Sequence, residues 1–300
     1  MKPLISVAVC TYNGSLFLEK QLMSILNQTY KNIEIVVVDD CSTDNTFEIT
    51  ETLAFKYPQI KSFKNTKNIG FNKNFEKAIK LTAGEYIAIS DQDDIWLENK
   101  LQKLMDNIKN KWLIFSNSEW MDEDENQLGK QTLGANFNLD IRTFKSFLFY
   151  NSVTGHTTLF SKTLLKYILP MPENGYYDWW IGFVASYHNQ ITCLNECLTL
   201  HRIHRSSVMH HFKGEKDKNT KIDRSKEIST NLSIVEKYKY LKESDQKLIS
   251  EIRSNFDKKG FSIYIVRLIY RYYQDFFPDL KNRKGLSRLN FAIKFANKSL

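Results

Sequence analysis

The sequence predicts an α/β fold in which a mainly parallel central sheet carries helices on both faces. Apolar runs typical of buried strands alternate with apolar residues at helical spacing, first over residues 4–9, then 18–26, then 33–38. This order is that of a βαβ unit, which joins two parallel strands through a helix. The clearest strands also run straight into polar or acidic residues, as they do in sheets that bind ligands at their carboxyl ends.

The same alternation continues through a second cycle. Ser42 is expected to cap a helix that ends at Pro58, and a short strand is expected over residues 60–63. A helix follows over residues 72–82, and a strand over residues 86–90. The expected product is an open, mainly parallel sheet with helices on both faces.

Length, charge and cysteine usage bound the class of protein. Three hundred residues with 42% hydrophobic content can bury one large core. Lys and Arg number 19 against 23 Asp and Glu over residues 1–200, but 23 against 11 over residues 201–300. The basic C-terminal third is therefore expected to meet an anionic surface. The first apolar run is too short for a signal peptide or a membrane span, and the four cysteines lack disulfide-framework spacing, which together predict a cytoplasmic protein.

Three carboxylates, Asp91, Asp93 and Asp94, lie within four residues directly after a predicted strand. This density of negative charge is costly unless a cation offsets it. Mg²⁺ and Mn²⁺ take oxygen ligands and retain substrate phosphates in their shells. Asp39 and Asp40, at the end of a neighbouring strand, favour the same interpretation. The alternative is an acidic turn in which Asp93 or Asp94 caps the next helix.

Four blocks of sequence occur in a fixed order: ISVAVCTYNG at 5–14, SILNQTY at 24–30, VVVDDCSTD at 36–44 and GEYIAISDQDDIW at 84–96. Together they resemble glycosyltransferase family 2, which has the GT-A fold, and the resemblance extends over roughly residues 4–205. The SDQDDIW version most resembles the branch that contains many bacterial rhamnosyltransferases. The resemblance implies a GT-A catalytic domain at 1–205 and a basic helical extension at 206–300. Within the domain it implies a nucleotide-binding half, about 1–96, and an acceptor half, about 97–205.

The resemblance assigns nucleotide binding to residues that follow the first strands. Thr11 and Asn13 match the turn that closes around the base and ribose. Asp40 matches the carboxylate that hydrogen-bonds the base, and Asn68 and Gly70 match a loop near the base. The donor implied is a dTDP- or UDP-sugar.

The resemblance also implies how the acidic cluster acts. Asp91 would face the ribose and the metal, Asp93 would be the principal metal ligand, and Asp94 would be an additional carboxylate. His204 aligns with a family histidine and would complete the metal shell or contact the diphosphate. Phosphate or sugar contacts are implied for four further residues: Arg202, Arg205, His156 and Trp179.

Asp178 is the candidate general base. It lies in the stretch Tyr177-Asp178-Trp179-Trp180, where the branch has an acidic residue followed by Trp. Its aromatic neighbours favour a raised pKa, which suits a proton acceptor. The alternative is that Asp178 caps the following helix. The family more often has His at the position of Tyr177, and this departure leaves the contact made there open.

The implied reaction is an inverting single displacement in the synthesis of bacterial surface polysaccharide, such as capsule, O-antigen or cell-wall glycan. The implied acceptor is a lipid-linked or polymeric glycan. A phosphotransferase with an Asp-x-Asp nucleophile is disfavoured, because that motif belongs after the first strand, where Thr11-Tyr12-Asn13 stands.

The basic tail raises a second rival, a nucleic-acid-binding module. Its basic residues are separated by apolar residues at helical spacing over 261–277, which suits a packed or membrane-facing helix better than a phosphate-tracking groove. We therefore expect no nucleic-acid partner. This apolar stripe either binds an anionic membrane surface, as in a peripheral enzyme at the inner face of the cell membrane, or packs on the catalytic body or forms a homodimer contact.

Overall fold

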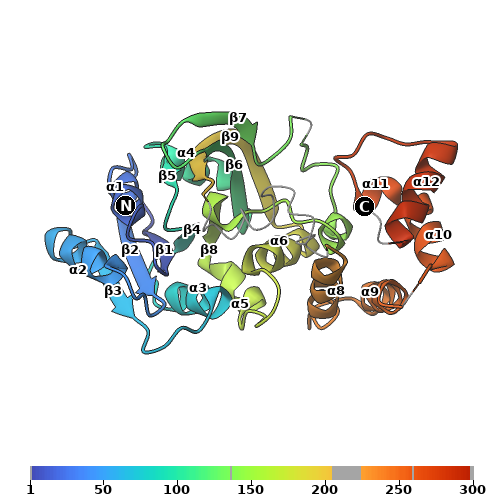
Figure 1. The fold of residues 1–300 in the computed structure, drawn as a ribbon, viewed down its shortest axis with the longest axis horizontal. Coiled ribbons are helices and arrows are strands. Elements are labelled where there is room, and N and C mark those ends of the chain that lie inside the picture. The colour runs from blue at the N-terminus through green and yellow to red at the C-terminus, as the bar shows by residue number, and fades with distance from the viewer. Residues whose placement is uncertain (1, 136, 205–223, 259, 298–300) are drawn as a thin grey trace.

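A computed structural model describes residues 2–135, 137–204, 224–258 and 260–297 of the chain (Figure 1). The strands are β1 (Ile5–Thr11), β2 (Ile33–Asp39), β3 (Ile60–Lys64), β4 (Tyr86–Ser90), β5 (Ile95–Trp96), β6 (Leu113–Met121), β7 (Gln127–Gln131), β8 (Thr158–Ser161) and β9 (Ile191–Arg202). The helices of the first 204 residues are α1 (Leu18–Leu26), α2 (Thr46–Lys56), α3 (Phe71–Lys80), α4 (Lys100–Ile108), α5 (Leu165–Ile168) and α6 (Tyr177–Tyr187), with short 3-10 helices η1 (Phe144–Leu148), η2 (Gly155–Thr157) and η3 (Lys162–Leu164). The helices that follow are α8 (Arg224–Val235), α9 (Glu243–Phe256), α10 (Ile263–Arg271), α11 (Tyr273–Phe276) and α12 (Gly285–Ala296).

One sheet organises the first 204 residues, in the order β3-β2-β1-β4-β8-β6-β9-β5, with β7 paired to β6. The first four strands in that order are parallel, which confirms the predicted α/β class. Beyond β4 the sheet is mixed, because β8 runs antiparallel to both β4 and β6, whereas β6 and β9 are parallel. The parallel ends of β1, β2 and β4 therefore meet at one edge, where the predicted site residues follow them.

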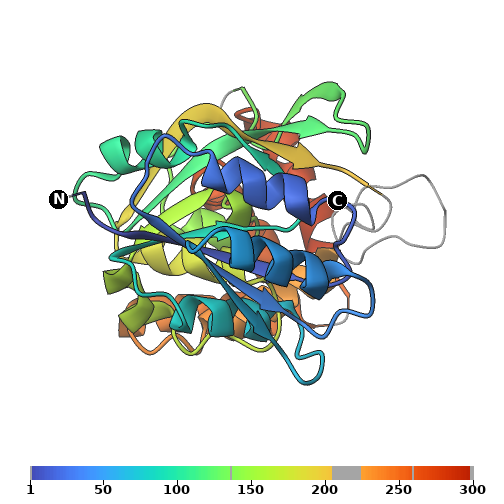
Figure 2. The ribbon, with the colours of Figure 1, turned by 90° about the vertical axis from the view of Figure 1, so that its left-hand side faces the viewer.

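Both faces of the parallel strands are covered, which explains why β2 is apolar without a break from Ile35 to Val38. Ile35 and Val37 belong to the core that α1 and α4 cover, and Val36 and Val38 belong to the core beneath α3. Alternate side chains of a strand point to opposite faces, so a strand buried on both sides needs an unbroken apolar run. Helices α1 and α3 accordingly lie on opposite sides of these strands (Figure 2).

The turn between β2 and α2 differs from the expectation. Helix α2 begins at Thr46, so the prediction that Ser42 caps it was wrong. The Ser42 amide and hydroxyl both donate to the carboxylate of Asp39, and Asp44 accepts from the Thr46 amide instead. A short polar side chain satisfies whichever backbone amide lies nearest, and here the Asp39 carboxylate draws Ser42 back to the strand end.

The C-terminal helices share one hydrophobic core with the sheet and α6. Helix α11 packs against η1, and α10 packs against α12. The Phe149 ring lies 5.0 Å, centroid to centroid, from the rings of both Phe276 and Phe295. Part of the predicted amphipathic stripe is thus covered by the protein itself, since Ile265, Leu268 and Ile269 are buried. Among the described residues, no helix combines the length and the hydropathy needed to cross a membrane.

Candidate active site

The loop between β4 and β5 carries the three clustered carboxylates to the edge where the parallel strands end. Asp94 is fully buried, Asp93 is partly buried, and the side chain of Asp91 is 35% exposed. Gln92, which lies between them, points back to the end of β1. Its side chain accepts a hydrogen bond from the Tyr12 amide at 2.8 Å and donates to the Tyr12 carbonyl at 3.1 Å. Gln92 therefore joins the β1 loop to the acidic loop, a role that the sequence analysis missed.

Asp94 is held by residues from β9. One carboxylate oxygen lies 2.9 Å from Nδ1 of His201 and accepts from the Arg202 amide at 3.1 Å. Burial by itself would raise the pKa of Asp94, but the nearby imidazoles of His156 and His201 hold it well below its usual range. The other carboxylate oxygen, Oδ2, is buried and has no hydrogen-bonding partner among the described residues.

Two histidine rings stack beside Asp94. The rings of His156 and His201 are 4.5 Å apart and inclined by 10°. Nδ1 of His156 lies 3.3 Å from Asp91 and 3.6 Å from Asp94, and its Nε2 lies 3.1 Å from the hydroxyl of Ser118. Burial lowers the pKa of His201, but the adjacent Asp94 carboxylate raises it above the ordinary value overall.

These residues fit a divalent cation. One ligand atom each from Asp94, His156 and His201 lies within 4.8 Å of the others. The donor set of one carboxylate and two imidazoles suits Mn²⁺ better than Mg²⁺, which prefers oxygen ligands alone. Oδ2 of Asp94 is a buried acceptor that receives no hydrogen bond from the described residues, so it is available to a cation. The sequence analysis gave His201 no ligand role and placed Asp93 first.

Asp93 lies next to this group and contacts the predicted histidine of the segment after β9. Its carboxylate oxygen lies 2.8 Å from Nε2 of His204, whose ring is 5.1 Å from that of Phe17. Burial raises the pKa of Asp93, and the charges of Asp94 and Asp91 raise it further. The structure thus brings Asp91, Asp93 and His204 to one site, as predicted. Their roles there stay predictions.

Arg202 does not lie as expected for a phosphate contact. Its guanidinium is fully buried and donates to the carbonyls of Asp93 and Glu123 and to the carboxylate of Glu125. Arg202 therefore joins the acidic loop to the turn before β7. This position does not support the predicted phosphate contact. Arg205 lies outside the described residues.

Asp178 lies in the first turn of α6, where its carboxylate accepts a hydrogen bond from the Trp179 amide at 2.7 Å. Burial raises the pKa of Asp178 to about 7, an effect that the charge of Asp91 reinforces and the backbone amides of Trp179 and Gly155 oppose. The alternative that Asp178 caps the helix was wrong, because α6 begins at Tyr177, its N-cap residue is Tyr176 and no side chain caps it. The raised pKa is the property expected of a base. Trp179 faces the core, where its indole N–H donates to the Phe147 carbonyl, a placement that does not support a sugar contact.

Tyr177 fills the position where the family more often has His. Its side chain is buried against Phe75, with ring centroids 4.2 Å apart. A Cβ placed on Gly155 would lie 2.0 Å from the Tyr177 hydroxyl oxygen, so only glycine leaves room for the tyrosine. Burial, followed by the charges of Asp91 and Asp178, raises the pKa of Tyr177 well above its ordinary value. The hydroxyl thus remains protonated beside these two carboxylates.

A buried lysine supports the histidine pair. Nζ of Lys100, at the start of α4, donates to the His156 carbonyl at 2.5 Å and to the Thr199 hydroxyl at 2.8 Å. It also lies 3.6 Å from the centre of the Trp96 ring. Burial lowers the pKa of Lys100 well below its ordinary value, against the opposing charges of Asp94 and Asp91. In the sequence, Lys100 lies on the same helix face as the apolar residues Leu101 and Leu104, and this pattern could have indicated that the lysine is buried.

The predicted nucleotide-binding residues surround the ends of β1 and β2. Asp40 accepts hydrogen bonds from the Asn65 side chain and from the amides of Ile69 and Gly70, at 2.7 to 2.9 Å. Asn68 is exposed and its side chain also accepts from the Gly70 amide, where the chain adopts a φ of 83°. Asp40 therefore shapes the loop that carries Asn68 and Gly70.

Thr11 and Asn13 shape the turn after β1. The hydroxyl of Thr11 donates to Asp39 at 3.0 Å. Asn13 has a φ of 48° and accepts from the Thr43 amide at 2.9 Å. The structure brings both residues to the strand edge that also carries Asp40.

Comparison with known proteins identifies the class. The profile described as Glycosyl transferase family 2 matches residues 6–169. An uncharacterized glycosyltransferase of Methanocaldococcus jannaschii is 31% identical over 225 residues, covering 72% of this chain and 76% of the relative. The chain belongs to glycosyl transferase family 2, and it is a glycosyltransferase.

Two bacterial relatives have more specific names. The dTDP-rhamnosyl transferase RfbG of Shigella flexneri is 40% identical over 115 residues, covering 37% of this chain and 38% of the relative. The UDP-Glc:alpha-D-GlcNAc-diphosphoundecaprenol beta-1,3-glucosyltransferase WfaP of Escherichia coli is 29% identical over 209 residues, covering 68% and 79% respectively.

Solved structures confirm the GT-A fold. TarS 1–349 of S. aureus in complex with UDP-GlcNAc superposes with a TM-score of 0.62 at 20% identity, covering 91% of this chain and 81% of TarS 1–349. The mannosyltransferase PcManGT of Pyrobaculum calidifontis, in complex with GDP-Man and Mn²⁺, gives a TM-score of 0.59 at 17% identity, covering 84% and 70%.

Proposed function

We propose that this glycosyltransferase moves rhamnose or another hexose from a dTDP- or UDP-sugar to an acceptor hydroxyl, with inversion, in bacterial surface-polysaccharide synthesis. The observation that carries the proposal is the position of Asp91 between two features. Its carboxylate lies 3.3 Å from His156 of the group that fits a cation, and its charge adds to the effect of burial, which is the main cause of the raised pKa of Asp178. The names of the Shigella and Escherichia relatives support the donor class and the polysaccharide setting.

Asp178 is the proposed general base. A carboxylate with a pKa of about 7 is ionised in half of the molecules at neutral pH, yet binds a proton far more readily than an ordinary aspartate. It takes the proton from the acceptor hydroxyl as that oxygen attacks the anomeric carbon from the face opposite the leaving diphosphate. Tyr177, protonated and packed against Gly155, closes the wall beside the base.

The metal is the proposed cofactor, Mg²⁺ or Mn²⁺, held by Asp94, His156 and His201 with Asp91 and Asp93 beside them. When bound there, a divalent cation stabilises the negative charge of the departing diphosphate. Lys100 fixes the backbone of His156, and Arg202 fixes the backbone of Asp93, so both histidine and acidic loop are held before the donor arrives. Asp40 holds the loop of Asn68 and Gly70 for the nucleotide base.

The C-terminal helices are proposed to bring the enzyme to an anionic membrane surface. Large apolar side chains remain exposed there, among them Ile263 at 60% and Leu286 at 84%. The basic residues Lys281, Lys284 and Arg288 lie in the same stretch of chain. Exposed apolar residues together with basic ones are the composition of a surface that binds anionic lipid.

A nucleotide-release assay tests the proposed function. Purified protein with Mn²⁺ and a panel of dTDP-, UDP- and GDP-sugars is expected to release nucleotide from dTDP- or UDP-sugars when acceptor is present. Thermal stabilisation by Mn²⁺ with UDP or dTDP is measured in parallel with stabilisation by an oligonucleotide. Stabilisation by the oligonucleotide alone would overturn the proposal in favour of a nucleic-acid-binding protein.

A further inference from the structure

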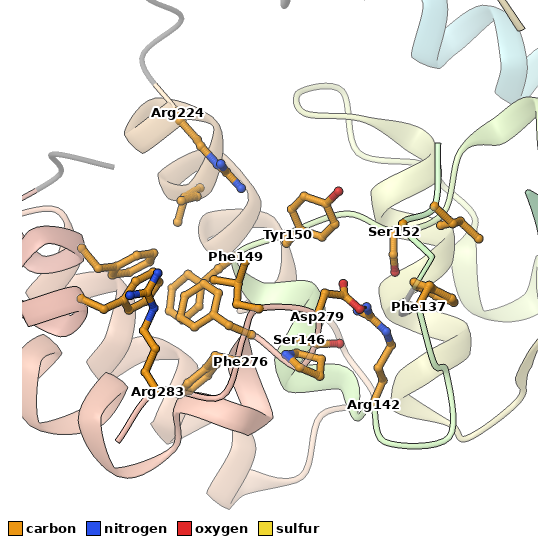
Figure 3. A pocket seen from close by; sticks show the side chains of 18 of the residues that line it. Phe137, Arg142, Ser146, Phe149, Tyr150, Ser152, Arg224, Phe276, Asp279 and Arg283 are labelled. Carbon is orange, nitrogen blue, oxygen red and sulfur yellow. The ribbon is translucent and has the colours of Figure 1, made fainter. Parts of the chain in front are cut away.

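A large cavity lies between the catalytic body and the C-terminal helices (Figure 3). It has a volume of about 1370 Å³ and is formed by the segment 132–152 on one side and by α8, α9, α11 and α12 on the other. Cavities that bind drug-sized ligands are typically about 300–1,000 Å³. This space is therefore large enough for an extended chain and not only for a small polar molecule.

The interior of the cavity is lined by aromatic side chains. In Figure 3, Phe149 and Phe276 lie on the side of the cavity away from Ser152 and Arg142. They belong to a set of seven phenylalanines in the lining: Phe137, Phe149, Phe256, Phe276, Phe277, Phe291 and Phe295. Such a lining favours an apolar ligand, because each buried CH₂ group contributes about 0.8 kcal/mol on leaving water.

Several polar atoms in the same lining have no hydrogen-bonding partner among the described residues. The Ser152 hydroxyl, Nε of Arg142 and Nε of Arg283 are buried and have no hydrogen-bonding partner among the described residues. Ser152 is 5% exposed, and the Arg142 side chain is 2% exposed. Buried donors without acceptors are costly, so these groups point to a ligand that supplies acceptor oxygens.

The charged residues of the lining indicate whether that ligand is an anion or a cation. The charged residues that line the cavity are Arg142, Arg224, Arg283 and Asp279, and Asp279 forms an ion pair with Arg142. Three guanidinium groups against one carboxylate leave an excess of positive charge. Guanidinium groups bind phosphate oxygens through paired N–H donors, so an anionic phosphate matches this lining.

The cavity is connected to the reacting centre by polar side chains. Thr132, which lines it, has its hydroxyl 2.7 Å from that of Ser118, and Ser118 lies 3.1 Å from Nε2 of His156. Ser152, on another part of the wall, lies three residues before Gly155 of the centre. The side of the cavity formed by Thr132 and Ser152 is thus the side linked to His156 and Gly155. Phe149 and Phe276 lie on the other side of the cavity from Ser152 (Figure 3).

We propose that this cavity binds the acceptor, as a lipid whose apolar chain lies along Phe149 and Phe276 and whose phosphate lies toward Ser152 and Arg142. The inference rests on the proposed function, because it makes the bound amphiphile the substrate that receives the sugar. In this arrangement the sugar carried on the phosphate reaches the centre beside Asp178. The chain leads toward the helices that are proposed to meet the membrane.

Binding of farnesyl diphosphate tests the inference, with farnesol and inorganic pyrophosphate as the two partial probes. Titration calorimetry is performed on the full chain with Mn²⁺ and saturating UDP, so that the donor site is occupied. Farnesyl diphosphate is expected to bind at least about tenfold more tightly than either partial probe, since it engages both the apolar and the basic lining. Pyrophosphate binding as tightly as farnesyl diphosphate would overturn the proposal and leave only an anion site.

Two variants locate that binding. Gly134 is exposed and lines the cavity, and a Cβ placed on it meets no atom within 4 Å, so Gly134→Trp adds an indole to the cavity wall without a clash at its Cβ. Arg224→Glu reverses an exposed charge in the first turn of α8, and Lys226→Glu makes the same change in that turn outside the lining. Gly134→Trp and Arg224→Glu are expected to weaken farnesyl diphosphate binding about tenfold and about fivefold, and Lys226→Glu by less than about twofold.

Two controls separate this inference from the proposed function. UDP binding with Mn²⁺ is expected to be unchanged in all three variants, and it shows that the donor site is intact. Suppose that the wild type binds UDP and releases nucleotide, but that Gly134→Trp binds farnesyl diphosphate as tightly as the wild type does. The cavity inference then fails, while the proposed function stands. A change of molecular mass in Gly134→Trp, read by light scattering, would assign the cavity to a second copy of this chain and overturn the lipid site.

Discussion

His201 and Asp94 form the closest contact within the proposed metal-binding group of Asp94, His156 and His201, with Nδ1 of His201 2.9 Å from one carboxylate oxygen of Asp94. The second oxygen of the same carboxylate is buried and accepts no hydrogen bond from the described residues. His156 approaches that oxygen to 3.6 Å, beyond hydrogen-bonding distance. A carboxylate held at one oxygen and left open at the other has the arrangement expected of the proposed metal ligand.

Removal of the metal is the first test of this arrangement. We expect EDTA to abolish sugar transfer and Mn²⁺ to restore it. Asp93→Ala should lose the thermal stabilisation that Mn²⁺ and nucleotide give together, and reduce turnover by about 10²-fold or more. Asp124→Ala, which removes an exposed carboxylate from the turn before β7, is the matched control and should behave as the wild type. Full wild-type activity in EDTA would exclude the metal from the mechanism.

Asp178→Asn tests the general base. The amide has nearly the same shape but cannot take up the proton of the acceptor hydroxyl. Transfer should fall by about 10²-fold or more, while donor affinity, measured by calorimetry with a nonhydrolysable nucleotide sugar, should be preserved. An equal fall in donor affinity and rate would make Asp178 a binding residue instead.

The pH dependence follows from the raised pKa of Asp178, about 7. The base acts only when ionised, so kcat should fall as pH drops below about 7, by about tenfold per pH unit. Above that pH the carboxylate is fully ionised and the rate should level off. The profile is measured at saturating donor, acceptor and Mn²⁺, and Asp178→Asn should lack this limb. A wild-type limb centred near pH 4 would show that the Asp178 pKa is not raised.

Gly155 and Tyr177 can be tested as a pair. Gly155→Ala places a Cβ 2.0 Å from the Tyr177 hydroxyl and should destabilise the protein by about 1–3 kcal/mol, because the packed wall has no space for it. Tyr177→Phe removes the hydroxyl, so the double variant should regain part of the melting temperature. A double variant no more stable than Gly155→Ala alone would show that the clash lies elsewhere.

The sequence was sufficient to predict the parallel half of the sheet and the cluster at its edge, because β1, β2 and β4 are predominantly apolar and end in polar residues. It was not sufficient for the mixed half, where β6, β8 and β9 come together from distant segments. His201 is an example, because only the register of β9 against β5 and β6 brings its side chain next to Asp94. Arg202, one residue further, is turned into the acidic loop for the same reason, and neither orientation can be read from spacing.

Membrane binding by the C-terminal helices is tested by co-sedimentation with vesicles. Wild type should bind vesicles that contain anionic lipid at low salt and release them at high salt, since Lys281 and Lys284 contribute about 1 kcal/mol each near such a surface. Leu286→Glu removes an 84% exposed apolar side chain and should weaken binding. Phe55→Glu, at a 96% exposed position on α2, is the matched control and should bind as the wild type does.

A truncation after residue 258 decides what else these helices do. It removes α10, α11 and α12, and with them Ile269, Tyr273 and Phe276 of the core shared with the catalytic body. The free energy lost with several buried side chains of this size exceeds the free energy of unfolding of an ordinary domain. The truncated protein should therefore unfold or aggregate. Circular dichroism against temperature measures this directly. If the full chain also fails to bind anionic vesicles at low salt, the membrane proposal is wrong. The role of the C-terminal helices is then to stabilise the protein through their packing on its core.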